Sequence, residues 1–489
     1  MKVARRITLA SAWRRPLARL ALAAALLLSA GVGAPALAVD WLQYIASYPD
    51  LIRALGANAL AGEQHYLSYG RAEGRPLDRF DERQYLANYP DLQRAFGQDT
   101  GKAVEHFIRF GYFEHRTDDP LGAPARPDIV FVLVDDMGAA VIGPERRTVS
   151  VATPNIDALA AAGTTYTQAY AAPACVPSRV MALTGRWPYR NSVGAVWNNG
   201  PTPPSSAVTI AERLGGIGYE TRIVGKWQLG TIVGKHPLDQ GFEHFFGFHG
   251  DTPDYFGADP DDPLWRDRTR VLNTGYVTDT LANEAETILR AGRDRPLFLF
   301  LSLTAIHDPL QTTMDYAVDG VDRALGRVLA AARPDTLFIL AGDNGRFVNE
   351  PLRGGKYSIW EGGVRVPFIL AWQGHVPAGA SSAVPVSLLD AAPTAMAAAG
   401  APVPAALDGL DLLTPLPAPR QIFFGAMGHA GHAIRQGRWK LYLGYEGLPV
   451  RLYDLLSDKG ESLNVAAGNT EVVRSLTAAI DAWKAEIDD

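Results

Sequence analysis

Cysteine is nearly absent from this chain, whose 489 residues include only Cys175. A single cysteine excludes an internal disulfide and leaves one thiol to be explained. The 48 glycines and 34 prolines have no regular spacing, which favours a loop-rich globular protein over a fibre.

A strong excess of one charge is also missing. Lysine and arginine number 46 against 52 acidic residues, which gives a net charge of −6. The chain therefore lacks the overall basic field that nucleic-acid binding needs. Its 47% of hydrophobic residues is ordinary for a soluble globular protein, and its length allows one large domain plus a smaller part.

The apolar run Leu20–Ala30 is shorter than the about 20 residues that cross a membrane. Five arginines precede it, and Ala36-Leu37-Ala38 has the small-x-small pattern of a cleavage site. We therefore predict a signal peptide over 1–38, cut near Ala38. The mature chain would have no membrane span and would be exported, as a periplasmic or secreted protein.

Residues 44–75 and 85–116 form an internal repeat with a constant offset of 41. Identical residues recur at that offset, among them Tyr48-Pro49-Asp50-Leu51 with Tyr89-Pro90-Asp91-Leu92, and His65 with His106. We predict two stacked helical repeats over 39–116, each of two short helices. They resemble the YPDL-type repeats that accompany secreted bacterial enzymes. No acidic or thiol partner stands at ligand spacing, so we expect both histidines to pack between helices.

The sequence pattern changes after a Pro/Gly/Asp-rich linker over 117–127. Between 128 and 415, apolar runs bounded by turns alternate with helical patterns. The predicted strands are Asp128–Val134, Thr221–Val224, Leu297–Leu303, Thr336–Leu340 and Val366–Ala371, and the predicted helices are Ile156–Ala162, Val208–Leu214 and Thr278–Ala291. This alternation predicts an α/β domain with a mostly parallel sheet and helices on both faces.

The last part of the chain, 416–489, has a different pattern. Four short runs read as antiparallel strands, and an amphipathic helix over Thr470–Ile487 follows them. The runs are Gln421–Phe424, Ala433–Gln436, Trp439–Leu443 and Val450–Tyr453. We predict a small C-terminal antiparallel α+β subdomain.

Four predicted strands are followed by residues that can bind a metal or an anion, and ligands gather at the carboxyl ends of such strands. These residues are Asp135-Asp136, Lys226, His307 and Asp343-Asn344. Any one of them has an ordinary explanation as a helix cap, a solvated side chain or a turn. Four such groups at one edge of a sheet indicate a binding site for a metal or an anion.

The ligand types define the chemistry of that site. Asp135, Asp136, Asp343 and Asn344 offer only oxygen, which suits Ca²⁺ or Mg²⁺ better than Zn²⁺. The positive charges come from Arg179, Lys226, His307 and Lys356. One divalent ion and several cations would hold a small anion with several oxygens.

Cys175-Val176-Pro177-Ser178-Arg179 stands where a helix is expected to begin. A lone cysteine is usually a small buried hydrophobe, and proline often starts a helix. Here the thiol would lie beside a guanidinium and the positive end of a helix, which favours an anion site.

Together these motifs resemble the type I sulfatases of the alkaline-phosphatase superfamily. The resemblance covers roughly 126–489 and leaves out the repeats. Its main motif runs from Cys175 through Leu183-Thr184-Gly185, and the others are Thr153-Pro154-Asn155-Ile156-Asp157, Gly225-Lys226-Trp227, Asp343-Asn344-Gly345, Lys356, Glu361-Gly362-Gly363-Val364-Arg365, Arg438-Trp439-Lys440 and Leu452-Tyr453-Asp454-Leu455. It implies an alkaline-phosphatase-like fold.

The resemblance also implies a mechanism. A maturation enzyme would oxidise Cys175 to Cα-formylglycine, whose hydrated gem-diol attacks the sulfur of a small sulfated ester or sulfated saccharide. Calcium, or magnesium, would be held by residue 175 with Asp135, Asp136, Asp343 and Asn344. Arg179 and Lys226 would orient the diol, while His307 and Lys356 would hold the sulfate and protonate the leaving alcohol.

Gln228 departs from the family pattern, in which a histidine usually stands two residues after the motif lysine. That histidine is thought to help remove the proton that expels sulfate, and glutamine has no useful basicity. Three outcomes are open: slow turnover, a substitute base such as His307 or an aspartate of the metal site, or a protein that binds without catalysis.

Two other functions are compatible with these motifs. A phosphonate or phosphate ester hydrolase would use the same fold and the same modified cysteine. A degenerate sulfatase would only bind sulfated glycans, although the retained motif residues argue against it. We expect specificity to lie in the loops Gly247–Asp262 and Gly425–His432, the second with His429 and His432.

Overall fold

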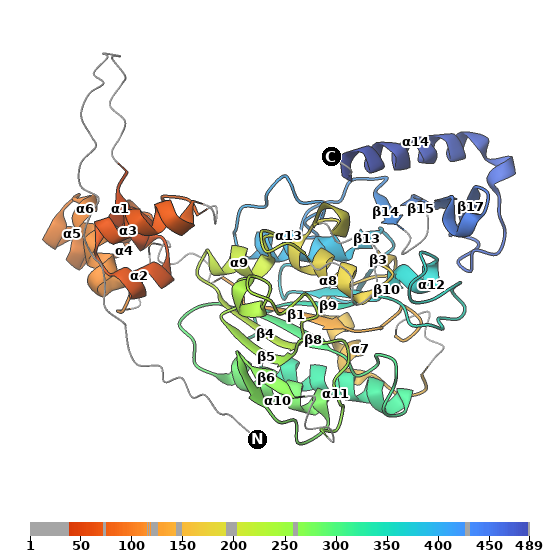
Figure 1. Cartoon of the computed structure of the whole chain (residues 1–489), viewed down its shortest axis with the longest axis horizontal. Helices are drawn as coiled ribbons and strands as arrows, with labels where there is room; N and C mark the ends of the chain where they lie inside the picture. The colour runs from red at the N-terminus through yellow and green to blue at the C-terminus, as the bar shows by residue number, and fades with distance from the viewer. Residues whose placement is uncertain are drawn as a thin grey trace, which may run out of the picture.

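The computed structural model describes residues 39–71, 75–114, 116, 118, 126–142, 149–191, 203–257, 263–425 and 431–487. The predicted apolar runs join one ten-stranded sheet (Figure 1). Its strand order is β12-β2-β11-β9-β1-β8-β4-β5-β6-β7. The strands are β1 (Ile129–Val134), β2 (Thr164–Tyr166), β4 (Glu220–Lys226), β5 (His244–Phe248), β6 (Leu264–Arg266), β7 (Thr269–Val271), β8 (Leu297–Leu303), β9 (Leu337–Gly342), β11 (Phe368–Ala371) and β12 (Ala380–Ser382). The predicted signal segment and most of the predicted linker lie outside the described residues.

The five central strands, β9, β1, β8, β4 and β5, pair in parallel. Side chains of β1 alternate between two cores, with Phe131 on one face and Val132 on the other. Every residue of β1 is buried, as expected for a strand covered on both sides. The predicted mostly parallel sheet is confirmed.

Helices cover both faces of this sheet (Figure 1). One layer contains α7 (Pro154–Ala162), α10 (Val277–Arg290) and α11 (Met314–Ala331). The other contains α8 (Cys175–Thr184), α9 (Ile210–Gly215) and α13 (Ala391–Ala398). A small sheet of β10 (Arg365–Val366), β3 (Ala169–Tyr170) and β13 (Val386–Ser387), with α12 (Glu361–Val364), lies beside the second layer.

The C-terminal part is an antiparallel sheet with one helix packed on it, as predicted. The strands β14 (Gln421–Gly425), β15 (His432–Gln436), β16 (Trp439–Leu443) and β17 (Arg451–Asp454) follow one another in order. The helix α14 (Thr470–Ile487) covers them, with Leu476 and Ile480 against Ile434 and Leu441. The domain boundaries given above stay a prediction.

The two repeats have matching helices, and each helix start recurs at the offset of 41. The first unit contains α1 (Trp41–Ala46), α2 (Pro49–Leu55), α3 (Ala59–His65) and the π-helical turn η1 (Tyr66–Gly70); the second contains α4 (Glu82–Asn88), α5 (Pro90–Phe96), α6 (Thr100–His106) and η2 (Phe107–Gly111). The prediction of two helices per unit was wrong. Pro49 and Pro90 begin new helices and so separate α2 and α5 from the helices before them.

The repeated histidines bond to repeated tyrosines, which confirms that they pack within their units. The Tyr44 hydroxyl lies 3.1 Å from Nδ1 of His65, and the Tyr85 hydroxyl 2.9 Å from Nδ1 of His106. The repeat segment also contacts the α/β part, because Arg79 donates to the Gly216 carbonyl at the end of α9 over 2.6 Å. Among the described helices, none combines the length and apolar character required to cross a bilayer.

Gly111 is expected to be essential for the second repeat. A methyl group on this residue would overlap the hydroxyl of the buried Tyr85. Gly111→Ala should therefore destabilise the unit by about 1–3 kcal/mol. Hydrogen exchange of the full-length protein should show faster exchange of the α4 and α6 amides.

Gly101→Ala is the matched control, because its new methyl would meet only the Asp99 carboxylate at 3.5 Å. This variant should keep wild-type exchange in α6. Adding Tyr85→Phe to Gly111→Ala should restore part of the protection. Unchanged exchange in Gly111→Ala would show that the Tyr85 ring can move aside.

Candidate active site

The carboxyl ends of four neighbouring strands bring the predicted site residues together. Asp135 and Asp136 follow β1, and Lys226 ends β4. His307 lies four residues beyond β8, and Asp343-Asn344 follows β9 directly. The strand order β9-β1-β8-β4 places these ends side by side, and all of these side chains are buried.

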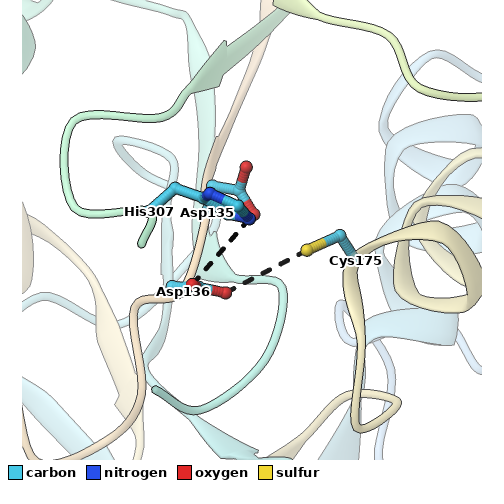
Figure 2. A group of neighbouring side chains, drawn as sticks. All are labelled: Asp135, Asp136, Cys175 and His307. Atoms are coloured by element: carbon cyan, nitrogen blue, oxygen red, sulfur yellow. Dashed lines mark hydrogen bonds and ion pairs between the residues drawn. The ribbon is translucent and has the colours of Figure 1, made fainter. Parts of the chain in front are cut away.

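The helix α8 contributes Cys175 as its first residue and Arg179 one turn later. The N-cap residue of α8, Ala174, provides no side-chain cap, so its side chain leaves the first amides of the helix unsatisfied. The Cys175 sulfur points at the Asp136 carboxylate, 4.0 Å from Oδ1 (Figure 2). Burial, reinforced by the charge of Asp135, raises the pKa of the Cys175 thiol well above its ordinary value. As an unmodified thiol the group is therefore a poor nucleophile at neutral pH.

Three buried oxygen atoms in this cluster lack a hydrogen-bond donor among the described residues: Asp135 Oδ1, Asp343 Oδ2 and Asn344 Oδ1. Buried acceptors without a partner are costly and rare in proteins. Burial and the neighbouring Asp135 charge raise the pKa of Asp343 well above its ordinary value, because two carboxylates crowd one small space. A hard divalent cation would satisfy these oxygens and relieve the repulsion, so the residues fit Ca²⁺ or Mg²⁺.

Asp136 is held in one orientation by three neighbours. Its backbone N–H donates to Asp343 Oδ1 over 2.9 Å, and Asn344 Nδ2 donates to its Oδ1 over 2.6 Å. Lys356 Nζ lies 2.8 Å from one carboxylate oxygen and 3.0 Å from the other. The backbone of Asp136 has φ 57°, a left-handed conformation that is uncommon for residues other than glycine and clusters at functional sites.

His307 lies in the same group of side chains, and each of Asp135, Asp136, Cys175 and His307 offers a ligand atom within 4.8 Å of the others (Figure 2). Both of its ring nitrogens already have partners. Nε2 lies 2.9 Å from Lys356 Nζ, and Nδ1 lies 2.7 Å from Thr252 Oγ1. Burial lowers the pKa of His307, which favours the neutral ring and leaves Nε2 as an acceptor for Lys356 Nζ.

Arg179 faces the carboxylates from α8. Its NH1 donates to the Lys226 carbonyl at 3.0 Å and to Ser302 Oγ at 2.7 Å. Its NH2 lies 3.6 Å from both Asp135 Oδ2 and Asp343 Oδ2. Nε and NH2 have no hydrogen-bond acceptor in the described part of the chain, so this edge of the guanidinium could bind an anion.

Lys226 bridges two carboxylates. Its Nζ lies 2.6 Å from Asp135 Oδ2 and 2.8 Å from Asp251 Oδ1. Although burial opposes it, the Lys226 charge holds the pKa of Asp135 well below its ordinary value. In the sequence, only the loop that contains Asp251 was singled out, because nothing in its local pattern marks this aspartate.

Gln228 is turned toward the same aspartate. Its Nε2 donates to Asp251 Oδ1 over 2.7 Å, and its backbone has a left-handed φ of 61°. Oε1 of Gln228 is buried without a partner among the residues described. Residue 228 therefore lies in the site, joined to a carboxylate 23 positions later in the chain.

The two loops expected to set specificity differ. The first places Asp251 and Thr252 in the site, while its residues 258–262 lie outside the described residues. In the second, residues 426–430 with His429 lie outside them as well. His432 begins β15, and its ring contacts Trp483 of α14 at 5.8 Å, within the C-terminal subdomain.

Comparison with known proteins agrees with this arrangement. Residues 127–401 match the family model described as Sulfatase. Human N-acetylgalactosamine-6-sulfatase is 34% identical over 356 residues, which cover 60% of this chain and 66% of that enzyme. Human arylsulfatase A is 30% identical over 458 residues, which cover 74% of this chain and 88% of that enzyme.

Solved structures give the same result. The crystal structure of Ps i-CgsB in complex with k-i-k-neocarrahexaose has a TM-score of 0.68 and 30% identity, covering 73% of this chain and 92% of that chain. The PsFucS1 sulfatase from Pseudoalteromonas sp. shares the fold with a TM-score of 0.65. None of these comparisons identifies the N-terminal helices as YPDL-type repeats. The parallel sheet, the cysteine at the start of α8 and the oxygen-rich strand ends are thus those of a known group of ester hydrolases, and the chain belongs to the sulfatase family.

Proposed function

We propose that this chain hydrolyses sulfate esters, with residue 175 as the nucleophile after a maturation enzyme has converted Cys175 to Cα-formylglycine. The observation that supports this most is the place of Cys175. Its sulfur faces Asp136 at the start of α8, among oxygen atoms that lack donors and three buried basic side chains.

When bound, the divalent ion and the hydrated aldehyde would supply a polarised oxygen nucleophile. Asp135, Asp136, Asp343 and Asn344, with residue 175, would hold the ion, for which we propose calcium or, alternatively, magnesium. Lys226 and Arg179 would then neutralise the negative charge that grows on the sulfate group.

Lys356 and His307 would hold the sulfate from the other side. Although burial opposes it, acidic neighbours that include Asp136 raise the pKa of Lys356, so this side chain carries a proton at neutral pH. Nε2 of His307, 2.9 Å from Lys356 Nζ, can relay a proton toward the leaving alcohol.

The charge balance of the site favours a sulfate monoester over a phosphate monoester. Among the described residues that line it, Arg179, Lys226 and Lys356 face four carboxylates, those of Asp135, Asp136, Asp343 and Asp251. These side chains together carry a net charge of −1, and a bound divalent ion would change it to +1. A sulfate monoester carries one negative charge, whereas a phosphate monoester carries nearly two at pH 7.

The names of two matched proteins suggest the leaving group. One relative is named for a sulfated amino sugar, and one solved structure holds a carrageenan-type hexaose. We therefore propose a sulfated saccharide as the substrate of this chain. We also propose export by the signal segment over 1–38, with cleavage near Ala38.

Cys175→Ala should lower the turnover of a nitrophenyl sulfate by at least about a thousand-fold, since the nucleophile is lost. The melting temperature should stay close to that of the wild type, because only the small reactive group of residue 175 is removed. Peptide mapping of the wild-type protein should find an aldehyde in place of the thiol at residue 175 and a new N-terminus near residue 39. Near-normal turnover in Cys175→Ala would rule out this mechanism.

Removal of divalent ions should abolish turnover, and Ca²⁺ or Mg²⁺ should restore it. The ion should also stabilise the fold, by about 2.7 kcal/mol at a concentration one hundred times its dissociation constant. Asp343→Asn should remove most of this calcium-dependent rise in melting temperature. Glu471→Gln, on the exposed side of α14, should keep it. Rescue by Zn²⁺ alone would contradict the all-oxygen ligand set.

Nitrophenyl sulfate should be preferred over nitrophenyl phosphate at pH 7.5 by about 100-fold or more in kcat/KM, because one unmatched charge costs several kcal/mol in such a site. The second pKa of a phosphate monoester is near 6, so it carries about one negative charge at pH 5. The preference should therefore narrow as the pH falls from 7.5 to 5. A constant ratio, or a preference for phosphate at pH 7.5, would contradict the charge argument.

A further inference from the structure

Among the described carboxylates of this site, Asp251 alone has no task in the proposed mechanism, on which the inference below rests. Once the alcohol has left, the sulfate group must depart from residue 175 before another cycle can begin. Its departure requires that a hydroxyl proton of residue 175 be taken up by a nearby base.

Most described side chains around residue 175 are unsuited to take that proton. Arg179 and Lys226 are cations, and Lys356 becomes one again once it has regained from water the proton that it relays to the leaving alcohol. His307 accepts from Lys356 at Nε2, and its Nδ1 is bonded to Thr252.

Most of the acidic and amide side chains around residue 175 are also unsuited to act as the base. The oxygens of Asp135, Asp136 and Asp343 would be committed to the divalent ion. Gln228 has no useful basicity. Among the residues that the structure describes, Asp251 is the remaining carboxylate in polar contact with this group of side chains.

The position of Asp251 suits a base. Its Oδ1 lies 2.8 Å from Lys226 Nζ, 2.7 Å from Gln228 Nε2 and 3.5 Å from His307 Nε2. Its side chain is 40% exposed, whereas the carboxylates of the metal cluster are fully buried, so a captured proton has a path to water. Although burial opposes it, Lys226 lowers the pKa of Asp251, so this carboxylate is ionised at neutral pH.

The backbone fixes Asp251 against the end of β4. Beyond the paired strands β4 and β5, the Trp227 amide donates to the Phe248 carbonyl over 3.1 Å, and the Gln228 amide donates to the His249 carbonyl over 3.2 Å. The left-handed φ of Gln228 then turns its amide group toward the carboxylate.

We propose that Asp251 is the proton acceptor of the sulfate-releasing step and that Gln228 is a positioning residue that holds its carboxylate. The O–H bond at residue 175 breaks, and its proton passes to an Asp251 oxygen. The electron pair of that bond forms the C=O of the aldehyde. The C–O bond to the sulfate breaks, and its electron pair leaves with the sulfate ion, so no oxidant or reductant is needed.

Asp251→Asn tests the proposal because it keeps the shape and removes the basicity. With a nitrophenyl sulfate, wild-type enzyme should release alcohol linearly from the first turnover. The variant should show a burst close to one alcohol per active site, then a steady rate about 100–1,000-fold below wild type. Peptide mass analysis during turnover should find the sulfo group on residue 175 in the variant alone.

A second variant distinguishes two roles of Asp251: a base that takes the proton, and a charge partner that only balances Lys226. Gln228→His combined with Asp251→Asn places an imidazole beside the lost carboxylate and leaves Lys226 unpaired on that side. It should raise the steady rate at least tenfold above Asp251→Asn and remove the sulfo adduct. Asp481→Asn is the control, since it neutralises an exposed aspartate of α14 in the C-terminal subdomain.

Each other outcome overturns the assignment. Equal loss of burst rate and steady rate in Asp251→Asn would make Asp251 a charge partner of Lys226. Near wild-type turnover in that variant, or a burst in the wild type, would show that Asp251 is not an effective base. A wild-type protein that carries formylglycine, binds calcium and hydrolyses no sulfate ester would instead refute the proposed function.

Discussion

The crowding of carboxylates at the carboxyl ends of β1 and β9 is the constraint on which the rest of this site depends. Asp135 and Asp343 are fully buried, and each has an oxygen without a donor among the described residues. Two like charges 4 Å apart repel by about 4 kcal/mol at the effective dielectric constant typical of protein sites. The arrangement is stable only if opposite charges surround it, and α8 and β4 supply them in Arg179 and Lys226. A divalent ion would complete the balance.

Close backbone contacts allow these charges to meet. In β4, Gly225 has φ 108°, and a side chain there would overlap the Ser302 carbonyl of β8. At the end of β9, a side chain on Gly342 would overlap the Met137 carbonyl in the loop after β1. These two glycines thus allow the strand ends that carry the site residues to approach closely.

Local patterns predicted the parts of the molecule that depend on local forces. Sequence patterns marked β8 and β16 to the residue. The run in β8 is almost continuously apolar because this strand is buried on both faces. The meeting of the oxygen-bearing side chains at one sheet edge was predictable because they follow strands directly. The second helix of each repeat, α2 or α5, was missed because only one or two residues separate it from the helix before it. Asp251 could not be assigned, because its role depends on which strand pairs with β4.

Gln228 shows why a motif position and a chemical task are different things. From the sequence alone, a glutamine in place of a histidine reads as the loss of a base. In the structure, parallel pairing of β4 and β5 brings a carboxylate from 23 residues further along to within 2.7 Å of that glutamine. A proton acceptor needs a position in space and a suitable environment, and either loop at this sheet edge can supply it. A histidine at position 228 and an aspartate at position 251 are thus two ways to place a proton acceptor near residue 175. A chain of this fold is best judged by the groups that surround residue 175, wherever in the sequence they originate.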